Sequence, residues 1–326
     1  MKNVILLLML LLLSCKQKPV TEIALWVPYD ESEELAQNAD HQSPKMHYKL
    51  IQSRILDKNA VWDNVAGQIS NFSEEDYQKL KPYILEQDIP TIQSHILAGD
   101  LTYEKLTQWY LYRIVKYEND RNTMLNNIIA INPEAVTEAR ERDKNRSDSD
   151  HPIYGMPVLL KDNVGMEGLP TTAGAAVLTD NMTADAFITE RIREKGGIIL
   201  GKANLSEWAN YLSSACPHGY SAVGGPTLNP YGRRKFDTGG SSSGSGTAMA
   251  ANYAAAAVGT ETSGSILSPS SANSLVGLKP TVGLLSRSGI VPLSGTLDTP
   301  GPMTRTVTDN AILLSALSGE DTTDIV

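Results

Sequence analysis

Cysteine, histidine and long apolar segments are scarce in this chain, and each shortage excludes a class of protein or site. Two of the 326 residues are cysteines, which leaves at most one disulfide. Beyond the N-terminus, no apolar run is long enough to span a membrane as a helix. We expect no metal, because the histidines show no metal-ligand spacing and lie scattered at His41, His47, His95, His151 and His218.

Positive charge is also in short supply. The chain has 28 Lys and Arg against 37 Asp and Glu, and its net charge is −9. Nucleic acids bind to clustered Lys and Arg, so we expect no nucleic-acid partner. Hydrophobic residues make up 41% and charged residues 20%, which is typical of an ordinary globular protein with a sizeable core.

The N-terminus has the pattern of an export signal. A short basic start is followed by ten apolar residues, 4–13, which is too short a run to span a bilayer. Leu12-Leu13-Ser14-Cys15 resembles a bacterial lipobox, which implies cleavage before Cys15 and attachment of lipid to its sulfur. We predict a signal peptide over 1–14 and a lipoprotein anchored in a membrane of the cell envelope; an ordinary signal peptide is the alternative. Cys216 would then have no disulfide partner, and we expect it to be buried or half-buried.

The next part of the chain divides by composition. Residues 15–72 are polar and rich in acidic groups, and we interpret them as a tether and linker. Residues 73–150 carry helical patterns. Ser73 is placed to cap a first helix, Gly99 to end a second, and the apolar stripe of a third starts at Leu106.

Residues 151–326 alternate helix with apolar strand, which predicts an α/β fold: a mixed, largely parallel central sheet covered by helices. A helix is expected over 184–195, and the strands are expected at 158–160, 198–200 and 254–259. Active sites in such sheets lie beyond the C-terminal ends of strands. Lys161 and Ser265 both follow predicted strands.

The stretch from Gly239 to Ser265 is rich in glycine and serine and allows three interpretations. A flexible linker is disfavoured because apolar elements border the stretch on both sides. A phosphate-binding loop needs a lysine directly after its glycines, and none follows until Lys279. A serine-hydrolase site remains.

Ser242 matches the serine of a known hydrolase motif, but the other residues that this motif requires are missing. Gly240-Ser-Ser242-Ser-Gly244 fits the G-x-S-x-G nucleophile elbow, which requires an acid and then a histidine later in the chain. The last histidine is His218, and no S-x-x-K motif occurs. A catalytic serine here must therefore use another base.

Several separated blocks together resemble the amidase signature family, in the right order from about Leu101 to the end of the chain. They are Gly155–Asn163, Gly201–Trp208, Gly239–Ser245, Gly259–Ile266, Val276–Thr281, Ser288–Pro292 and Asp298–Met303. Gly-Thr-Glu-Thr and the Asn229-Pro-Tyr segment resemble the peptide-amidase branch. Family members usually continue into a large C-terminal portion, so the resemblance implies that 73–326 is an amidase domain with its C-terminal part missing.

The resemblance implies a triad of Lys161, Ser241 behind a cis peptide bond, and Ser265 as nucleophile. The family separates its two serines by twenty-four residues, and 265 − 241 gives 24. Lysine acts as a base only when neutral, and burial lowers its pKa toward that state, although Asp162 nearby would oppose the shift. Ser241 would relay the proton.

The family's oxyanion hole consists of backbone N–H groups before the nucleophile, implied here at Thr262, Ser263 and Gly264. A helix starting near Ser265 would add its N-terminal positive charge. Ser263 stands where many members have glycine. Leu267 stands where many have arginine, which suggests a different support for this loop.

The resemblance implies an amidase that acts on a small amide or peptide amide without a cofactor. Two alternatives stay open: the glutaminase subunit of a tRNA-dependent amidotransferase, and an inactive fragment that keeps the motif. An export signal disfavours the first alternative, since tRNA substrates are not found outside the cytoplasm.

Overall fold

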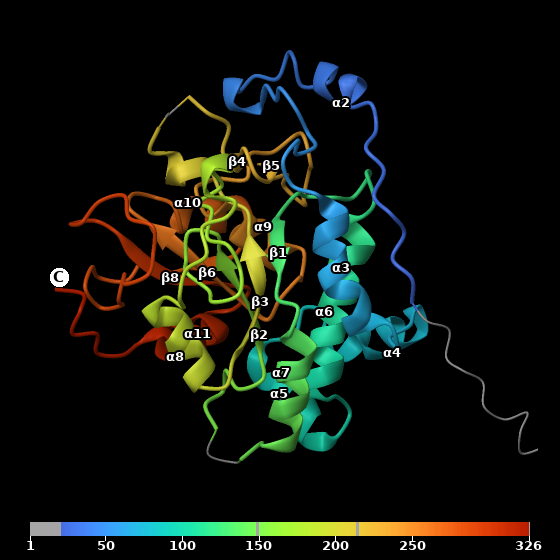
Figure 1. The fold of residues 1–326 in the computed structure, drawn as a ribbon, viewed down its shortest axis with the longest axis vertical. Coiled ribbons are helices and arrows are strands. Elements are labelled where there is room, and N and C mark those ends of the chain that lie inside the picture. Colours follow the sequence, from blue (N-terminus) through green and yellow to red (C-terminus); the bar gives the residue numbers. More distant parts are fainter. Residues whose placement is uncertain (1–20, 148–149, 213–214, 326) are drawn as a thin grey trace, which may run out of the picture.

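The computed structural model describes residues 21–147, 150–212 and 215–325 (Figure 1). The predicted signal peptide over 1–14 and the predicted lipid attachment at Cys15 lie outside the described residues. Within the described ranges, no helix is both long enough and apolar enough to cross a membrane.

The three predicted N-terminal helices are present. Helix α4 (Glu74–Ile84) begins with a capping box, in which the Ser73 side chain and Asp76 satisfy each other's backbone N–H groups. Helix α5 (Ile89–Ala98) ends at Gly99, whose φ of 80° is a left-handed conformation that glycine adopts readily. Helix α6 (Tyr103–Glu118) buries the predicted apolar stripe from Leu106 onward.

The chain before Ser73 differs from the predicted tether, because much of it packs against the domain. Helix α3 (Lys58–Ile69) buries Trp62, Val65 and Ile69 in the main core, and Asp57 caps its first turn. Apolar residues are a minority here, but their helical spacing places them on one face. Two shorter elements precede this helix: α2 (Ser32–Ala36) and the 3₁₀ helix η1 (Pro44–Met46).

A mixed sheet of six strands forms the centre of the described chain, in the order β1-β3-β2-β6-β8-β7. The middle strands β3, β2 and β6 are parallel, whereas β1, β8 and β7 pair antiparallel. The α/β prediction is therefore confirmed, with parallel pairing confined to the middle of the sheet. The strand bounds are β1 (Ile128–Ile131), β2 (Pro157–Lys161), β3 (Ile198–Ala203), β6 (Ala256–Glu261), β7 (Val276–Gly277) and β8 (Thr299–Thr304).

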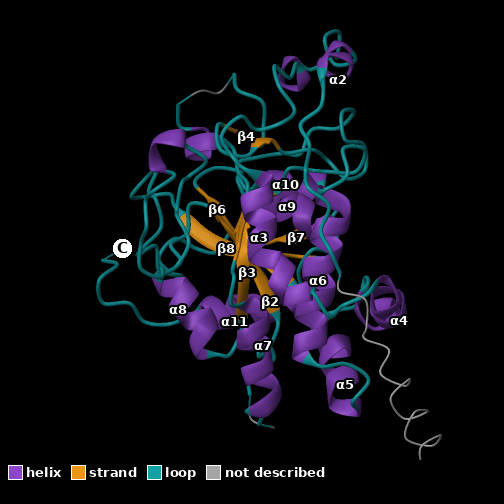
Figure 2. Cartoon of the chain, turned by 45° about the vertical axis from the view of Figure 1, so that its right-hand side comes forward, coloured by secondary structure: helices purple, strands orange, loops and turns teal. Residues whose placement is uncertain are grey.

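Helices cover the sheet from two sides. Helices α3, α6 and α7 lie to one side of the strands, and α8 and α11 lie side by side on the other (Figures 1 and 2). Helix α9 (Ser243–Ala250) packs on β6 and is buried almost throughout. The remaining helix bounds are α7 (Ala135–Lys144), α8 (Phe187–Glu194), α10 (Leu267–Ala272) and α11 (Val307–Leu317). Short elements fill the loops: η2 (Ala176–Leu178), η3 (Glu207–Asn210), β4 (Tyr220–Ser221) and β5 (Gly225–Pro226).

Candidate active site

Lys161 is the last residue of β2 and its side chain is fully buried. Its Nζ donates hydrogen bonds to the Ser241 Oγ at 2.8 Å, the Thr260 Oγ1 at 2.8 Å and the Thr260 carbonyl at 3.2 Å. Parallel pairing of β2 with β6 places Thr260 beside the lysine. The structure thus brings together Lys161 and Ser241, which are 80 residues apart in the sequence.

Burial lowers the pKa of Lys161 from 10.5 to about 7, against the opposing attraction of Asp298 and Glu261. A substantial share of this amine is therefore neutral near pH 7 and able to accept a proton. The Asp162 carboxylate, expected from the sequence to oppose this shift, faces another cation. It lies 3.3 Å from Lys202 in a fully buried ion pair and also accepts a hydrogen bond from the Thr172 hydroxyl.

Ser241 follows a cis peptide bond with Gly240, as the family resemblance implies. The serine is buried, and its carbonyl accepts the Ser206 N–H at 2.9 Å. A Cβ added to Gly240 would lie 2.7 Å from the Ser206 Oγ, closer than real Cβ contacts come. An alanine at position 240 would therefore displace the Ser206 hydroxyl, which accepts the Gly219 N–H at 2.9 Å.

The neighbouring serines hold the loop in place. The Ser242 hydroxyl donates to the Thr260 carbonyl at 3.1 Å and accepts the Thr260 N–H at 3.2 Å. The Ser243 hydroxyl donates to the Gly239 carbonyl at 2.9 Å, in the first turn of α9. These contacts agree with setting Ser242 aside as a nucleophile, because its hydroxyl joins the Gly/Ser loop to β6.

Ser265 lies in the loop between β6 and α10 and is 8% exposed. Its carbonyl accepts the Ser242 N–H at 3.1 Å, so the loops that carry Ser241 and Ser265 are directly joined. Helix α10 begins two residues after Ser265, near the predicted place.

The predicted oxyanion donors differ in their surroundings. The Gly264 N–H donates to the Glu261 Oε1 at 2.6 Å, so this group is engaged within the loop and does not point to a substrate. The prediction for Gly264 thus disagrees with this conformation, because the nearby carboxylate captures the donor. The Thr262 side chain donates to the Asp298 carboxylate. Thr262 and Ser263 remain as the predicted backbone donors.

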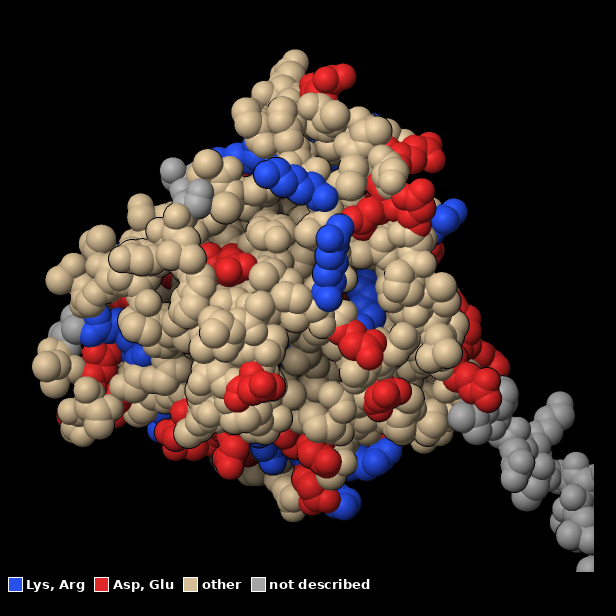
Figure 3. All heavy atoms as spheres, turned by 45° about the horizontal axis from the view of Figure 1, so that its top comes forward, with Lys and Arg blue, Asp and Glu red and all other residues tan. Residues whose placement is uncertain are grey.

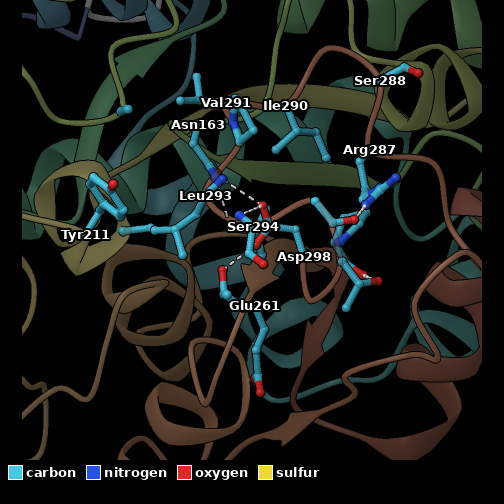
Figure 4. A pocket seen from close by; sticks show the side chains of 18 of the residues that line it. Asn163, Tyr211, Glu261, Arg287, Ser288, Ile290, Val291, Leu293, Ser294 and Asp298 are labelled. Atoms are coloured by element: carbon cyan, nitrogen blue, oxygen red, sulfur yellow. Dashed lines mark hydrogen bonds between the residues drawn. The ribbon is translucent and has the colours of Figure 1, made fainter. Parts of the chain in front are cut away.

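A cavity of about 310 Å³ adjoins Thr260, Glu261 and Thr262. Figure 4 shows its labelled side chains, with Asp298 near the middle and Tyr211 at one end. Trp208 and Tyr211 both line the cavity. Its other wall is largely apolar and consists of Ile290, Val291, Pro292 and Leu293.

Three acidic residues at this cavity, Glu261, Asp298 and Asp324, were given no role in the sequence interpretation. The Asp298 Oδ2 accepts the backbone N–H groups of Leu293 and Ser294, each at 2.7 Å, and so fixes the apolar wall. Asp324 forms an ion pair with Arg287 at 2.5 Å. The only sequence signal for Asp298 was its place in the Asp298–Met303 block that matches the family. The residues next to it in the sequence do not indicate which loop its carboxylate contacts.

Cys216 is exposed, so the expectation of a buried or half-buried thiol is wrong. It lies in the segment between η3 (Glu207–Asn210) and β4 (Tyr220–Ser221). On the face shown in Figure 3, Asp and Glu are interspersed with Lys and Arg. Among the described residues, no three or more His, Cys, Asp or Glu are grouped so as to hold a metal ion.

Comparison with known proteins identifies the family of this chain. A family model described as Amidase matches residues 105–325. A probable amidase of Arabidopsis thaliana is 46% identical over 247 residues, covering 74% of this chain and 47% of that protein. The structure of an amidase family protein from Bacillus anthracis superposes with a TM-score of 0.80 at 45% identity, covering 85% of this chain and 55% of that one.

Two further relatives are a peptide amidase and a subunit of an amidotransferase. The peptide amidase of Stenotrophomonas maltophilia superposes with a TM-score of 0.71 at 46% identity, covering 74% of this chain and 50% of that one. A glutamyl-tRNA(Gln) amidotransferase subunit of Lawsonia intracellularis is 38% identical over 234 residues, covering 72% of this chain and 46% of that protein. The chain spans about half the length of the relatives it matches.

Proposed function

Because the chain belongs to the amidase signature family, we propose that it hydrolyses a carboxamide C–N bond through a serine acyl-enzyme. The observation that carries the proposal is the buried contact of 2.8 Å between the Lys161 Nζ and the Ser241 Oγ, beside the loop of Ser265. A lysine with its pKa lowered by burial to about 7 supplies the base that a serine nucleophile needs.

In the proposed reaction, neutral Lys161 takes a proton from Ser241, which takes one from Ser265. The Ser265 oxygen attacks the amide carbon, and the oxyanion is held by the N–H groups of Thr262 and Ser263. Lys161 then returns the proton through Ser241 to the amide nitrogen, because an unprotonated amine leaves poorly. The C–N bond breaks and leaves an ester on Ser265. Water hydrolyses this ester by the same relay, which gives the acid and restores the enzyme.

A peptide amide is the proposed substrate class. The solved peptide amidase is 46% identical to this chain, whereas the amidotransferase subunit is 38% identical. The apolar wall of the cavity suits an acyl side chain, and Trp208 and Tyr211 offer aromatic surface. The second candidate, a glutaminase subunit, rests only on the similarity to the amidotransferase protein. Ammonia release from peptide amides, compared with release from glutamine, separates the two.

Replacing Ser265 with alanine tests the central claim. We expect loss of amide turnover and of labelling by a fluorophosphonate, which reacts with activated serines. Ser268→Ala is the matched control, because Ser268 is exposed in α10 three residues away. Labelling that survives in Ser265→Ala would refute the assignment of the nucleophile. A wild-type chain that neither turns over amides nor becomes labelled would support the inactive fragment.

We also propose that lipid on Cys15 anchors the protein in the cell envelope. The support is the basic start, the short apolar run and the lipobox-like ending in the sequence. Radiolabelled fatty acid should enter the wild type and not Cys15→Ala. Equal incorporation in both would refute the anchor.

A further inference from the structure

A single carboxylate holds the loop that carries Ser265. The Glu261 Oε1 accepts the N–H of Gly264 at 2.6 Å. Its Oε2 accepts the N–H groups of Ile266 at 2.8 Å and Leu267 at 3.0 Å. Ser265 therefore lies between two backbone groups that are bound to the same side chain, one directly before it and one directly after it.

Glu261 is buried where the cavity adjoins the loop, with only 4% of its surface exposed. Its side chain points away from the cavity in Figure 4, toward the loop. A buried carboxylate is costly unless hydrogen bonds or a cation compensate its charge, and the three N–H groups supply most of this compensation. The carboxylate is thus committed to the loop and leaves the cavity to other side chains.

Lys279 completes this arrangement from the other side. Its Nζ donates to the Thr262 carbonyl at 2.7 Å and lies 3.9 Å from the Glu261 Oε1. The same cation therefore contacts the start of the loop and the carboxylate that holds its end. Leu267, where an arginine was expected from the family, is 48% exposed and offers no charge here. The support for this loop comes instead from a strand end and a distant lysine.

We propose that Glu261 and Lys279 form a clamp that positions Ser265 for attack, with Glu261 as a positioning residue of the reaction. This inference rests on the proposed function, because it takes Ser265 as the nucleophile. Bonds to Gly264 and Ile266 restrict the backbone on both sides of Ser265, and the bond to Leu267 sets where α10 begins. Hydrogen bonds to an ionised acceptor are stronger than neutral ones, so one carboxylate suffices for the whole loop.

Glu261 has a second, separable effect, because its negative charge favours the protonated form of Lys161 and raises the pKa of that amine. Asp298 acts in the same direction and is the larger cause. Lys279 lies 3.9 Å from the Glu261 carboxylate, and Asp162 and Lys202 form an ion pair with each other. A purely structural residue would affect folding alone, whereas Glu261 should affect both the position of Ser265 and the titration of its base.

Two substitutions at Glu261 separate these effects. Glu261→Gln keeps the size of the side chain but has one acceptor oxygen, so it cannot serve all three N–H groups. We expect kcat to fall by about ten- to a hundredfold with little change in KM. The acid limb of the kcat/KM profile should move to lower pH, because the loss of the anion makes protonation of Lys161 less favourable. Glu261→Asp keeps the charge but is one methylene too short, so kcat should fall while the acid limb stays at the wild-type pH.

Glu141→Gln is the matched control, because Glu141 is about half exposed on α7 and its change should leave both kinetic constants unaltered. Lys279→Met provides a second, independent variant on the rim of the clamp, where the lysine side chain is 25% exposed. We expect a fall of about threefold to tenfold in kcat at an unchanged melting temperature, which corresponds to one charge-assisted hydrogen bond. This variant decides the question if Glu261→Gln does not fold.

The clamp would be overturned if the wild type is active and Glu261→Gln has the same kcat. If Glu261→Gln does not fold, an unchanged kcat in Lys279→Met would overturn it instead. A fall in kcat in Glu261→Gln without any shift of the acid limb would also overturn the proposed double role. The proposed function fails by a different result, namely no fluorophosphonate labelling of Ser265 in the wild type.

Discussion

Replacing Lys161 with methionine removes the buried amine and keeps most of the side-chain volume. We expect this variant to be inactive, and its stability relative to the wild type should depend strongly on pH. The reason is the difference between the folded and unfolded chains: burial lowers the pKa of Lys161 to about 7 in the folded protein, whereas the unfolded chain has the ordinary pKa of 10.5. Between these values the unfolded chain binds one more proton than the folded chain.

The sign and size of the effect follow from this difference. Since the unfolded state binds more protons, the wild type loses stability as the pH falls from 10.5 toward 7, by about 1.4 kcal/mol per pH unit. The accumulated loss at pH 7 is about 4 kcal/mol, and it levels off below about pH 6, where both states are fully protonated. The variant has no amine and escapes this loss. It also lacks the hydrogen bonds to Ser241 and Thr260, each worth about 1 kcal/mol, but that offset does not change with pH.

Urea unfolding followed by tryptophan fluorescence at pH 7.5, 8.5 and 9.5 measures the difference directly. The free energy of unfolding of Lys161→Met minus that of the wild type should fall by about 2 to 3 kcal/mol across this range. Other titrating groups contribute equally to both proteins and cancel. A difference that stays constant with pH would refute the lowered pKa of Lys161 and, with it, the assignment of this lysine as base.

Three further outcomes follow from the same structure. The wild-type kcat/KM should fall about tenfold for each pH unit below about 7, because protonated Lys161 cannot act as base; a flat profile between pH 5 and 7 would contradict this. Gly240→Ala should lower kcat at least tenfold, because the new Cβ meets the Ser206 Oγ at 2.7 Å; wild-type turnover would show that the loop has room. Trp62→Ala should lower the free energy of unfolding by about 3 to 5 kcal/mol, because Trp62 is buried in the core through α3. A change below about 0.5 kcal/mol in urea unfolding would instead favour the tether first predicted for this segment.

Local signals predicted the elements that depend on neighbouring residues. Ser73 marks a helix start through its side chain, and Gly99 marks a helix end through its backbone freedom. Both lie at the helix ends where they were expected. Helix α9 begins at Ser243, and its first turn is buried through serine and glycine, which carry no apolar pattern that would mark a helix start. Helix α3 was missed because a few spaced apolar residues lie among many polar ones.

Residue order by itself determined the family and the spacing of Ser241 and Ser265, and it led to the prediction of Lys161 as their base, because these depend on motifs that lie along the chain. Only the tertiary structure decided which partner each charged side chain contacts. Asp162 faces Lys202 and not Lys161, and Glu261 holds the loop of Ser265. The physical reason is that a carboxylate takes the donors that folding brings within about 3 Å, and a linear pattern does not specify which donors those are.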